Sequence, residues 1–88
     1  MKQIKLNGRE RSVLRVLDMS CGNTGEELLE RARLDPDDLV NVLNGLISPG
    51  YMEVVPYSEE TTVETFMASH FDINPSYASD LRDAMTRR

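Results

Sequence analysis

The stretch RARLDPDDLVNVLNGLISPGYMEVVP, residues 31–56, decides the fold. Asp35 followed by Pro36 is a typical helix start, with Asp35 as N-cap and Pro36 in the first helical position. At about 100° per residue, the apolar residues that follow share one broad arc of a helix. They are Leu39, Val40, Val42, Leu43, Leu46 and Ile47. The SPG at 48–50 stops this helix, because proline cannot donate and glycine tolerates a positive φ. YMEVVPY at 51–57 then has strand composition.

Two further helices are expected before this stretch. NGRE is an Asn-x-x-Glu capping arrangement with Asn7 as cap, and it predicts a helix over 8–19. TGEE is a second capping box, with Thr24 as cap and Glu27 three residues later, and it predicts a helix over 25–33. KQIKL at 2–6 has the composition of a short strand.

After residue 57 the sequence leaves two alternatives open. TTVETFMASHFDI at 61–73 alternates poorly as a strand, although its β-branched start favours one. As a helix it has a Thr61/Glu64 capping box and an apolar period. A final helix is expected from Asn74 as cap, with Pro75 first.

Composition limits the class of protein. A chain of 88 residues with 40% hydrophobic and 28% charged residues suits one ordinary globular domain. No apolar run approaches the ~18 residues of a membrane span, and the N-terminal residues lack a secretion signal, so we expect a cytoplasmic protein without membrane contact. One cysteine, Cys21, and one histidine, His70, leave no internal disulfide and no Cys/His zinc cluster. No cofactor or metal is expected.

TGEELLERARLDPDDLVNVLNGLISPGYMEVVP, residues 24–56, resembles the winged helix-turn-helix superfamily of small bacterial regulators. With the first helix the resemblance covers 8–57. It implies an α+β, mainly α fold: three core helices, a short β-hairpin wing with its tip at SEET (58–61), and an added C-terminal helix. The expected organisation is one domain over 1–88, with its core at 8–57, a wing or extra helix at 58–73 and the C-terminal helix at 74–88.

In that superfamily the third helix enters the major groove of DNA, and an added C-terminal helix often forms a dimer. Carried onto this chain, the resemblance implies four reading residues on the third helix: Asp37, Asn41, Asn44 and Ser48. Three side chains of the last helix are the candidate dimer contact: Tyr77, Leu81 and Met85.

The charge distribution disagrees with DNA binding. From Leu34 to Leu81 there is no Lys or Arg, but there are nine acidic residues: Asp35, Asp37, Asp38, Glu53, Glu59, Glu60, Glu64, Asp72 and Asp80. Duplex binders gain most of their affinity from Lys and Arg near phosphates. The aspartates at the start of the third helix are explained by capping and by the helix dipole, yet they still present negative charge to an approaching duplex.

We therefore expect a non-catalytic regulatory or adaptor module that contacts a basic protein partner, or a second copy of itself, through the acidic third helix and wing. The alternative is a sequence-specific DNA-binding regulator. Asn41 and Asn44 would then pair with adenine, and four arginines would contact the backbone: Arg11, Arg15, Arg31 and Arg33. An enzyme is least favoured, because nothing in the sequence places Cys21 beside His70.

Overall fold

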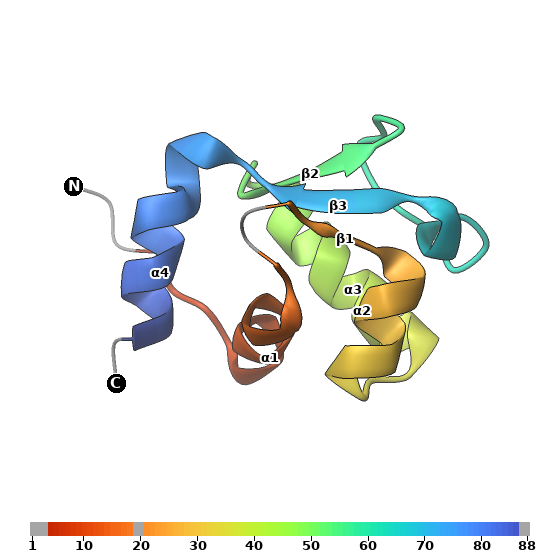
Figure 1. Cartoon of the computed structure of the whole chain (residues 1–88), viewed down its shortest axis with the longest axis horizontal. Helices are drawn as coiled ribbons and strands as arrows, with labels where there is room; N and C mark the ends of the chain where they lie inside the picture. Colours follow the sequence, from red (N-terminus) through yellow and green to blue (C-terminus); the bar gives the residue numbers. More distant parts are fainter. Residues whose placement is uncertain (1–3, 19–20, 87–88) are drawn as a thin grey trace.

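The computed structural model describes residues 4–18 and 21–86. These residues contain four α-helices, three short strands and two 3-10 helices, joined by loops (Figure 1). The helices are α1 (Gly8–Val16), α2 (Gly25–Ala32), α3 (Pro36–Ile47) and α4 (Ala78–Thr86). The strands are β1 (Asn23–Thr24), β2 (Met52–Val55) and β3 (His70–Ile73), and the 3-10 helices are η1 (Phe66–Ala68) and η2 (Pro75–Tyr77). The expected α+β, mainly helical class is confirmed.

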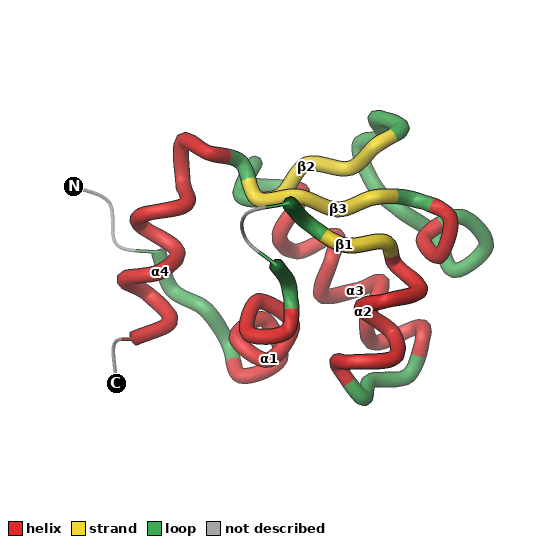
Figure 2. Tube along the Cα trace, viewed as in Figure 1, coloured by secondary structure: helices red, strands yellow, loops and turns green. Residues whose placement is uncertain are grey.

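The three strands form one antiparallel sheet in the order β1-β3-β2 (Figure 2). β3 lies in the middle and brings the last third of the chain against both earlier strands. The register pairs Asn23 with Phe71 on one side of β3, and Glu53 with Asp72 on the other. Strands β2 and β3 alternate between buried and more exposed residues, so one face of the sheet packs on the helices and the other faces solvent.

The core lies between the sheet and the helices. Its largest fully buried side chains come from all parts of the fold: Leu14 of α1, Leu28 of α2, Leu39, Leu43 and Leu46 of α3, Met52 of β2, Phe66 of η1, Phe71 of β3 and Leu81 of α4. The expected apolar arc of α3 is confirmed, because five of its residues are buried and Ile47 packs partly buried against them. No helix among the described residues is both long and apolar enough to cross a membrane.

The helix starts agree with the sequence. The Asn7/Glu10 and Thr24/Glu27 capping boxes are both complete, with the cap side chain bonded to the N3 amide and the glutamate bonded back to the cap amide. The hydrogen bond from the Thr24 amide, together with one from the Asn23 side chain, holds the pKa of Glu27 below its usual value. Asp35 occupies the N-cap of α3 as expected, but its side chain makes no capping hydrogen bond.

Two helices end earlier than the sequence indicated. Helix α1 stops at Val16, because Leu17 takes an extended backbone while its amide still bonds to Val13. The predicted end at Met19 lies outside the described residues. Helix α2 stops at Ala32, because Arg33 adopts a left-handed conformation with φ 57°.

The segment 61–73, for which the sequence left helix and strand open, is a single element in neither form; it contains a turn, a short 3-10 helix and a strand. Residues 63–65 form a turn, 66–68 form η1, and a strand starts only at His70. The predicted Thr61/Glu64 capping box is wrong: the turn is instead closed by the Thr62 carbonyl, which accepts from the amides of Thr65 and Phe66.

The two ends of the chain are partly as expected. Asn74 caps η2 by accepting from the Ser76 amide, and α4 continues from it to Thr86. Residues 87–88 of the predicted final helix lie outside the described part. Residues 4–7 form neither helix nor strand, and residues 2 and 3 of the suggested KQIKL strand are not described.

Candidate functional site

Helix α3 presents a narrow polar strip to solvent. Asp37, Asn41 and Ser48 are exposed, and at about 100° per residue they point away from the buried arc. These are three of the four side chains that the resemblance implies as readers. The fourth, Asn44, is only half-buried and lies at the margin of the strip.

One flank of the strip is closed by Asn44 itself. Its side-chain amide donates to the Thr61 carbonyl at 3.0 Å, and its side-chain oxygen accepts from the Thr61 amide at 2.7 Å. Thr61 is buried, so the Asn44 side chain fastens the loop after β2 onto α3 in the manner of a backbone bridge. The pair of hydrogen bonds that Asn44 was expected to offer to adenine is therefore already used inside the protein.

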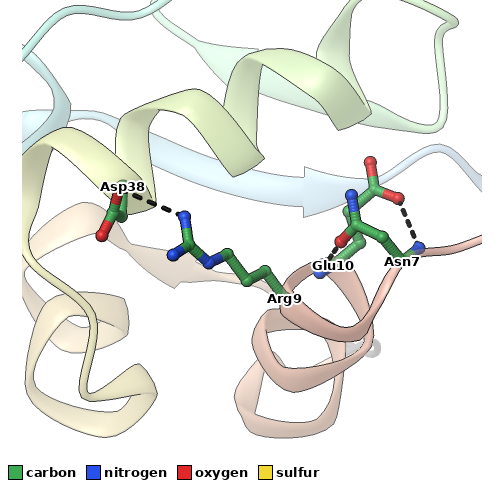
Figure 3. Close-up of polar contacts among 4 residues, drawn as sticks. All are labelled: Asn7, Arg9, Glu10 and Asp38. Carbon is green, nitrogen blue, oxygen red and sulfur yellow. Dashed lines mark hydrogen bonds and ion pairs between the residues drawn. The ribbon is translucent and has the colours of Figure 1, made fainter.

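The other flank is formed by the first turn of α1 (Figure 3). Arg9 lies 3.2 Å from the Asp38 carboxylate across the gap between the two helices, and Asn7 and Glu10 fix the turn that carries it. A side chain at Gly45 would come within 3.3 Å of the Glu10 carboxylate. The exposed positions of α3 and its C-cap are Pro36, Asp37, Asn41, Gly45 and Ser48, and Asp37, Asn41 and Ser48 are those among them with a polar side chain.

A groove of about 960 Å³ begins where this strip ends. It is lined by the C-terminal end of α3, by all four residues of β2, by Tyr57–Glu60 of the following loop, and by Asp72 and Asn74. Ser48 belongs to both the strip and the groove wall, so the two surfaces are continuous. Two large apolar side chains line the groove and are well exposed, Val55 at 61% and Tyr57 at 84%.

The groove is acidic. Glu53, Glu59, Glu60 and Asp72 line it, and among the described residues none of them forms an ion pair. Glu53 and Asp72 are direct cross-strand neighbours on the solvent-facing side of the sheet, where like charges repel. We define the acidic face as the strip of α3 together with this groove.

Sequence reasoning missed the groove. The alternation in MEVV places Glu53 outward, but the sequence gives no register between residues 53 and 72. That register depends on β3, which begins only after the irregular segment 58–69.

The four arginines proposed as DNA-backbone contacts lie elsewhere. Arg15 and Arg31 are exposed on α1 and α2, and Arg33 is exposed in the turn between α2 and α3. Arg11 is half-buried, and its Nε atom has no hydrogen-bond partner among the described residues. None of the four lines the groove.

The structure also limits the candidate dimer contact on α4. Leu81 is fully buried in the protein's own core, so it is not available to a second copy. Tyr77 and Met85 are partly buried against that core, and the Tyr77 ring lies edge-on to Tyr51 with 5.1 Å between centroids. These three side chains pack η2 and α4 against the core of their own chain, and a dimer contact through them stays a prediction.

Cys21 and His70 are closer than the sequence suggested. The His70 Nε2 atom lies 2.9 Å from the carbonyl oxygen of Cys21, so that nitrogen carries a proton and donates, and it cannot act as a base towards the thiol. The Cys21 sulfur instead lies 3.1 Å from the Asp18 carboxylate. That hydrogen bond, with partial desolvation and nearby negative charges, raises the pKa of the Cys21 thiol above its usual value. The environment of Cys21 therefore opposes thiolate formation, which a nucleophilic cysteine needs.

Within the described ranges, no group of three or more His, Cys, Asp or Glu side chains is arranged to hold a metal ion. Comparisons with protein-family models, with curated proteins and with solved structures found no match to this chain.

Proposed function

We propose that this chain is a winged-helix-like adaptor domain that binds a protein partner with a basic surface through its acidic face. The order α1-β1-α2-α3-β2-β3, with β3 between the other two strands, supports the resemblance to winged helix-turn-helix proteins. The three-residue turn between α2 and α3 also suits a helix-turn-helix. Fold alone does not define function, so the surface must carry the argument.

The observation that carries the proposal is the uncompensated acidity of this surface. No Lys or Arg occurs between Leu34 and Leu81, the segment that supplies α3, β2, the loop after it and β3. In the described part of the chain, α3 forms one ion pair, between Asp38 and Arg9, and it lies outside the free strip. Opposite charges on two proteins speed their encounter and exclude wrong partners, so this face suits a basic partner.

The same geometry disfavours a DNA duplex. A recognition helix reads bases with several side chains near its N-terminus, and here that end carries Asp37 and Asp38. Asn44 is engaged by Thr61, which leaves Asn41 as the asparagine of α3 free to contact a base. A wing normally adds cations beside the phosphate backbone, whereas the corresponding loop here carries Glu59 and Glu60.

Duplex binding is the first test. Fluorescently labelled random-sequence duplex DNA at low salt should show no micromolar binding to the purified domain by anisotropy. Low salt is chosen because it strengthens phosphate contacts, so a negative result there is informative. Tight binding that weakens steeply with added salt would overturn the proposal.

Partner capture with matched baits is the second test. Proteins retained by the wild-type domain from its native cell should be lost with the bait Glu59→Lys/Glu60→Lys. They should be kept by the control bait Glu30→Lys/Asp83→Lys, which changes the net charge equally at exposed positions of α2 and α4. Equal loss from both baits would show that net charge, and not the acidic face, determines binding.

Sequence-specific DNA binding remains the second candidate, because Asn41 is exposed at the centre of the α3 strip. Selection from a randomised duplex library would enrich one motif if this function is correct, and Asn41→Ala would abolish the enrichment. Failure to enrich any motif leaves the adaptor function.

A further inference from the structure

Strand β2 has a free edge. It is an outer strand of the sheet, since β3 pairs with it on one side and, within residues 4–18 and 21–86, no strand pairs on the other (Figure 2). In an antiparallel pair, alternate residues direct their amide and carbonyl groups away from the partner strand. Among the described residues, Met52–Val55 make no backbone hydrogen bond other than those to β3. The outward groups of β2 are therefore available to another chain.

The groove runs along this edge. Side chains alternate between the two faces of a strand, yet all four consecutive residues of β2 line the groove. A surface that touches both sets reaches the edge of the strand, and Asp72 of β3 extends it onto the solvent-facing side of the sheet. An extended segment lying in the groove would meet the unpaired backbone groups directly.

The acidic side chains beside the free edge of β2 determine which kind of strand can pair with it. Exposed edges risk joining to a second copy, and proteins prevent this with charged residues and with proline. The edge of β2 carries such residues: Glu53 on the strand, Pro56 at its end, and Glu59 and Glu60 in the following loop. The same carboxylates that repel another acidic copy attract a basic strand, which would also relieve the repulsion between Glu53 and Asp72.

Apolar contact is available at the same place. Val55 and Tyr57 are 61% and 84% exposed, and both line the groove. Tyrosine provides a large contact area at low conformational cost, which is why it is common in interfaces. A partner segment with alternating basic and apolar side chains would place one set against the carboxylates and the other near Val55 and Tyr57.

We propose that an extended basic segment of a partner protein binds by adding a fourth strand to the free edge of β2, with its Lys or Arg side chains among Glu53, Glu59, Glu60 and Asp72. This inference rests on the proposed adaptor function and specifies how the partner is held. Strand addition draws affinity from main-chain hydrogen bonds and specificity from the alternate side chains.

The test uses a short capped peptide in which Lys alternates with Val, titrated into the isotope-labelled domain at low salt and followed by NMR. The backbone amides of Met52–Val55 should shift, and the outward amides should gain protection from hydrogen exchange. A peptide in which Glu replaces each Lys should not bind. If no shift occurs with the basic peptide, the inference is wrong.

N-methylated peptides distinguish strand addition from simple charge attraction. Two versions carry N-methyl groups on the two alternate sets of backbone amides, which removes donors without changing charge. One version should bind about tenfold or more weakly, since it loses its hydrogen bonds to β2, while the other binds as before. Equal binding of both versions would overturn strand addition and leave the adaptor proposal intact.

Charge variants locate the site. Glu53→Gln/Asp72→Asn should weaken binding of the basic peptide, and Glu30→Gln/Asp83→Asn, which removes the same charge elsewhere, should leave it unchanged. Equal weakening by both pairs would contradict the groove as the binding site. Sedimentation of the free domain at high concentration gives a further test, because a dimer paired through β2 would show that the edge belongs to a second copy.

Discussion

The Asn44 side chain is expected on the exposed side of a helix, but in the structure it forms hydrogen bonds within the protein. In sequence it belongs to the polar side of a helix, with Asn41 one turn earlier. In the structure its two polar atoms are bonded to the backbone of Thr61, seventeen residues further along the chain. Asn41 stays exposed. The two asparagines are therefore chemically alike and structurally different.

Substitution of the two asparagines should separate these roles. Asn44→Ala removes both bonds and leaves the buried Thr61 amide and carbonyl without partners, so we expect the free energy of unfolding to fall by about 1–3 kcal/mol. Asn41→Ala, the matched control, should change it by no more than about 0.5 kcal/mol. Urea unfolding followed by circular dichroism measures both. Equal effects would show that the contact with Thr61 does not contribute to stability.

The reactivity of Cys21 is a second prediction about a single residue. Because the Asp18 carboxylate accepts from the thiol and raises its pKa, alkylation by iodoacetamide should reach half its maximal rate at a pH above the ordinary thiol value of about 8.5. Asp18→Asn removes the negative charge that favours the protonated thiol, so the midpoint should move to lower pH. Mass spectrometry of the alkylated protein gives the rates.

The urea-unfolded protein is the control for that experiment, since it should react with the midpoint of a free cysteine. An unchanged midpoint in the folded Asp18→Asn variant would contradict the assigned role of Asp18.

At the scale of elements, the register of β2 and β3 buries apolar side chains on one side of the sheet and places two carboxylates opposite each other on the other side. Its buried side carries Met52, Val54, Phe71 and Ile73 into the core. Its solvent side places Glu53 directly opposite Asp72. Apolar burial determines this register, because a shift by one residue would expose the whole buried set. The carboxylate pair is a consequence that the folded chain tolerates.

Removing that conflict should stabilise the free protein. Glu53→Gln keeps the shape of the side chain and removes the repulsion with Asp72, so we expect the unfolding free energy to rise by about 0.2–1 kcal/mol. The increase should shrink in high salt, where the charges are screened. Thermal unfolding at two salt concentrations measures this, with Glu30→Gln as a control that should change little. A loss of stability in Glu53→Gln would mean that the carboxylate makes a favourable contact.

At the scale of the whole molecule, the packing of α4 determines whether its apolar side chains are exposed to another protein. Leu81 and Ala84 of α4 are buried in the core, and Tyr77 packs on Tyr51 just before β2. The final helix therefore completes the same hydrophobic core that the other helices and the sheet share (Figure 1). This use of α4 agrees with our proposal that the acidic face, and not α4, binds the partner.

Leu81→Ala tests this arrangement. Deleting a fully buried leucine side chain should lower the unfolding free energy by about 2–5 kcal/mol. The unfolding midpoints of wild type and variant should not depend on protein concentration, because the contact lies within one chain. Met67→Ala, at a side chain that is 41% exposed, is the mild control. A midpoint that rises with concentration in the wild type and not in Leu81→Ala would show that Leu81 joins two copies.

Local signals in the sequence determined most of the helices. The two capping boxes and the Asp-Pro and Asn-Pro starts are formed by residues three or fewer positions apart, so they act before any tertiary contact exists. The apolar arc of α3 and the alternation of β2 are likewise properties of short stretches. The acidity of residues 34–81 was also plain from composition.

Tertiary structure decided what no short window contains. Segment 58–69 has no dominant period, so its path is set by distant contacts: Thr61 on Asn44, and the Gly25 amide on the Ser69 carbonyl, where a side chain at residue 25 would collide with Phe66. That path fixes where β3 begins, which in turn places Asp72 beside Glu53 and leaves the outer edge of β2 free. The charges of the candidate site thus came from the sequence, but their assembly into one groove required the pairing of strands separated by an irregular loop.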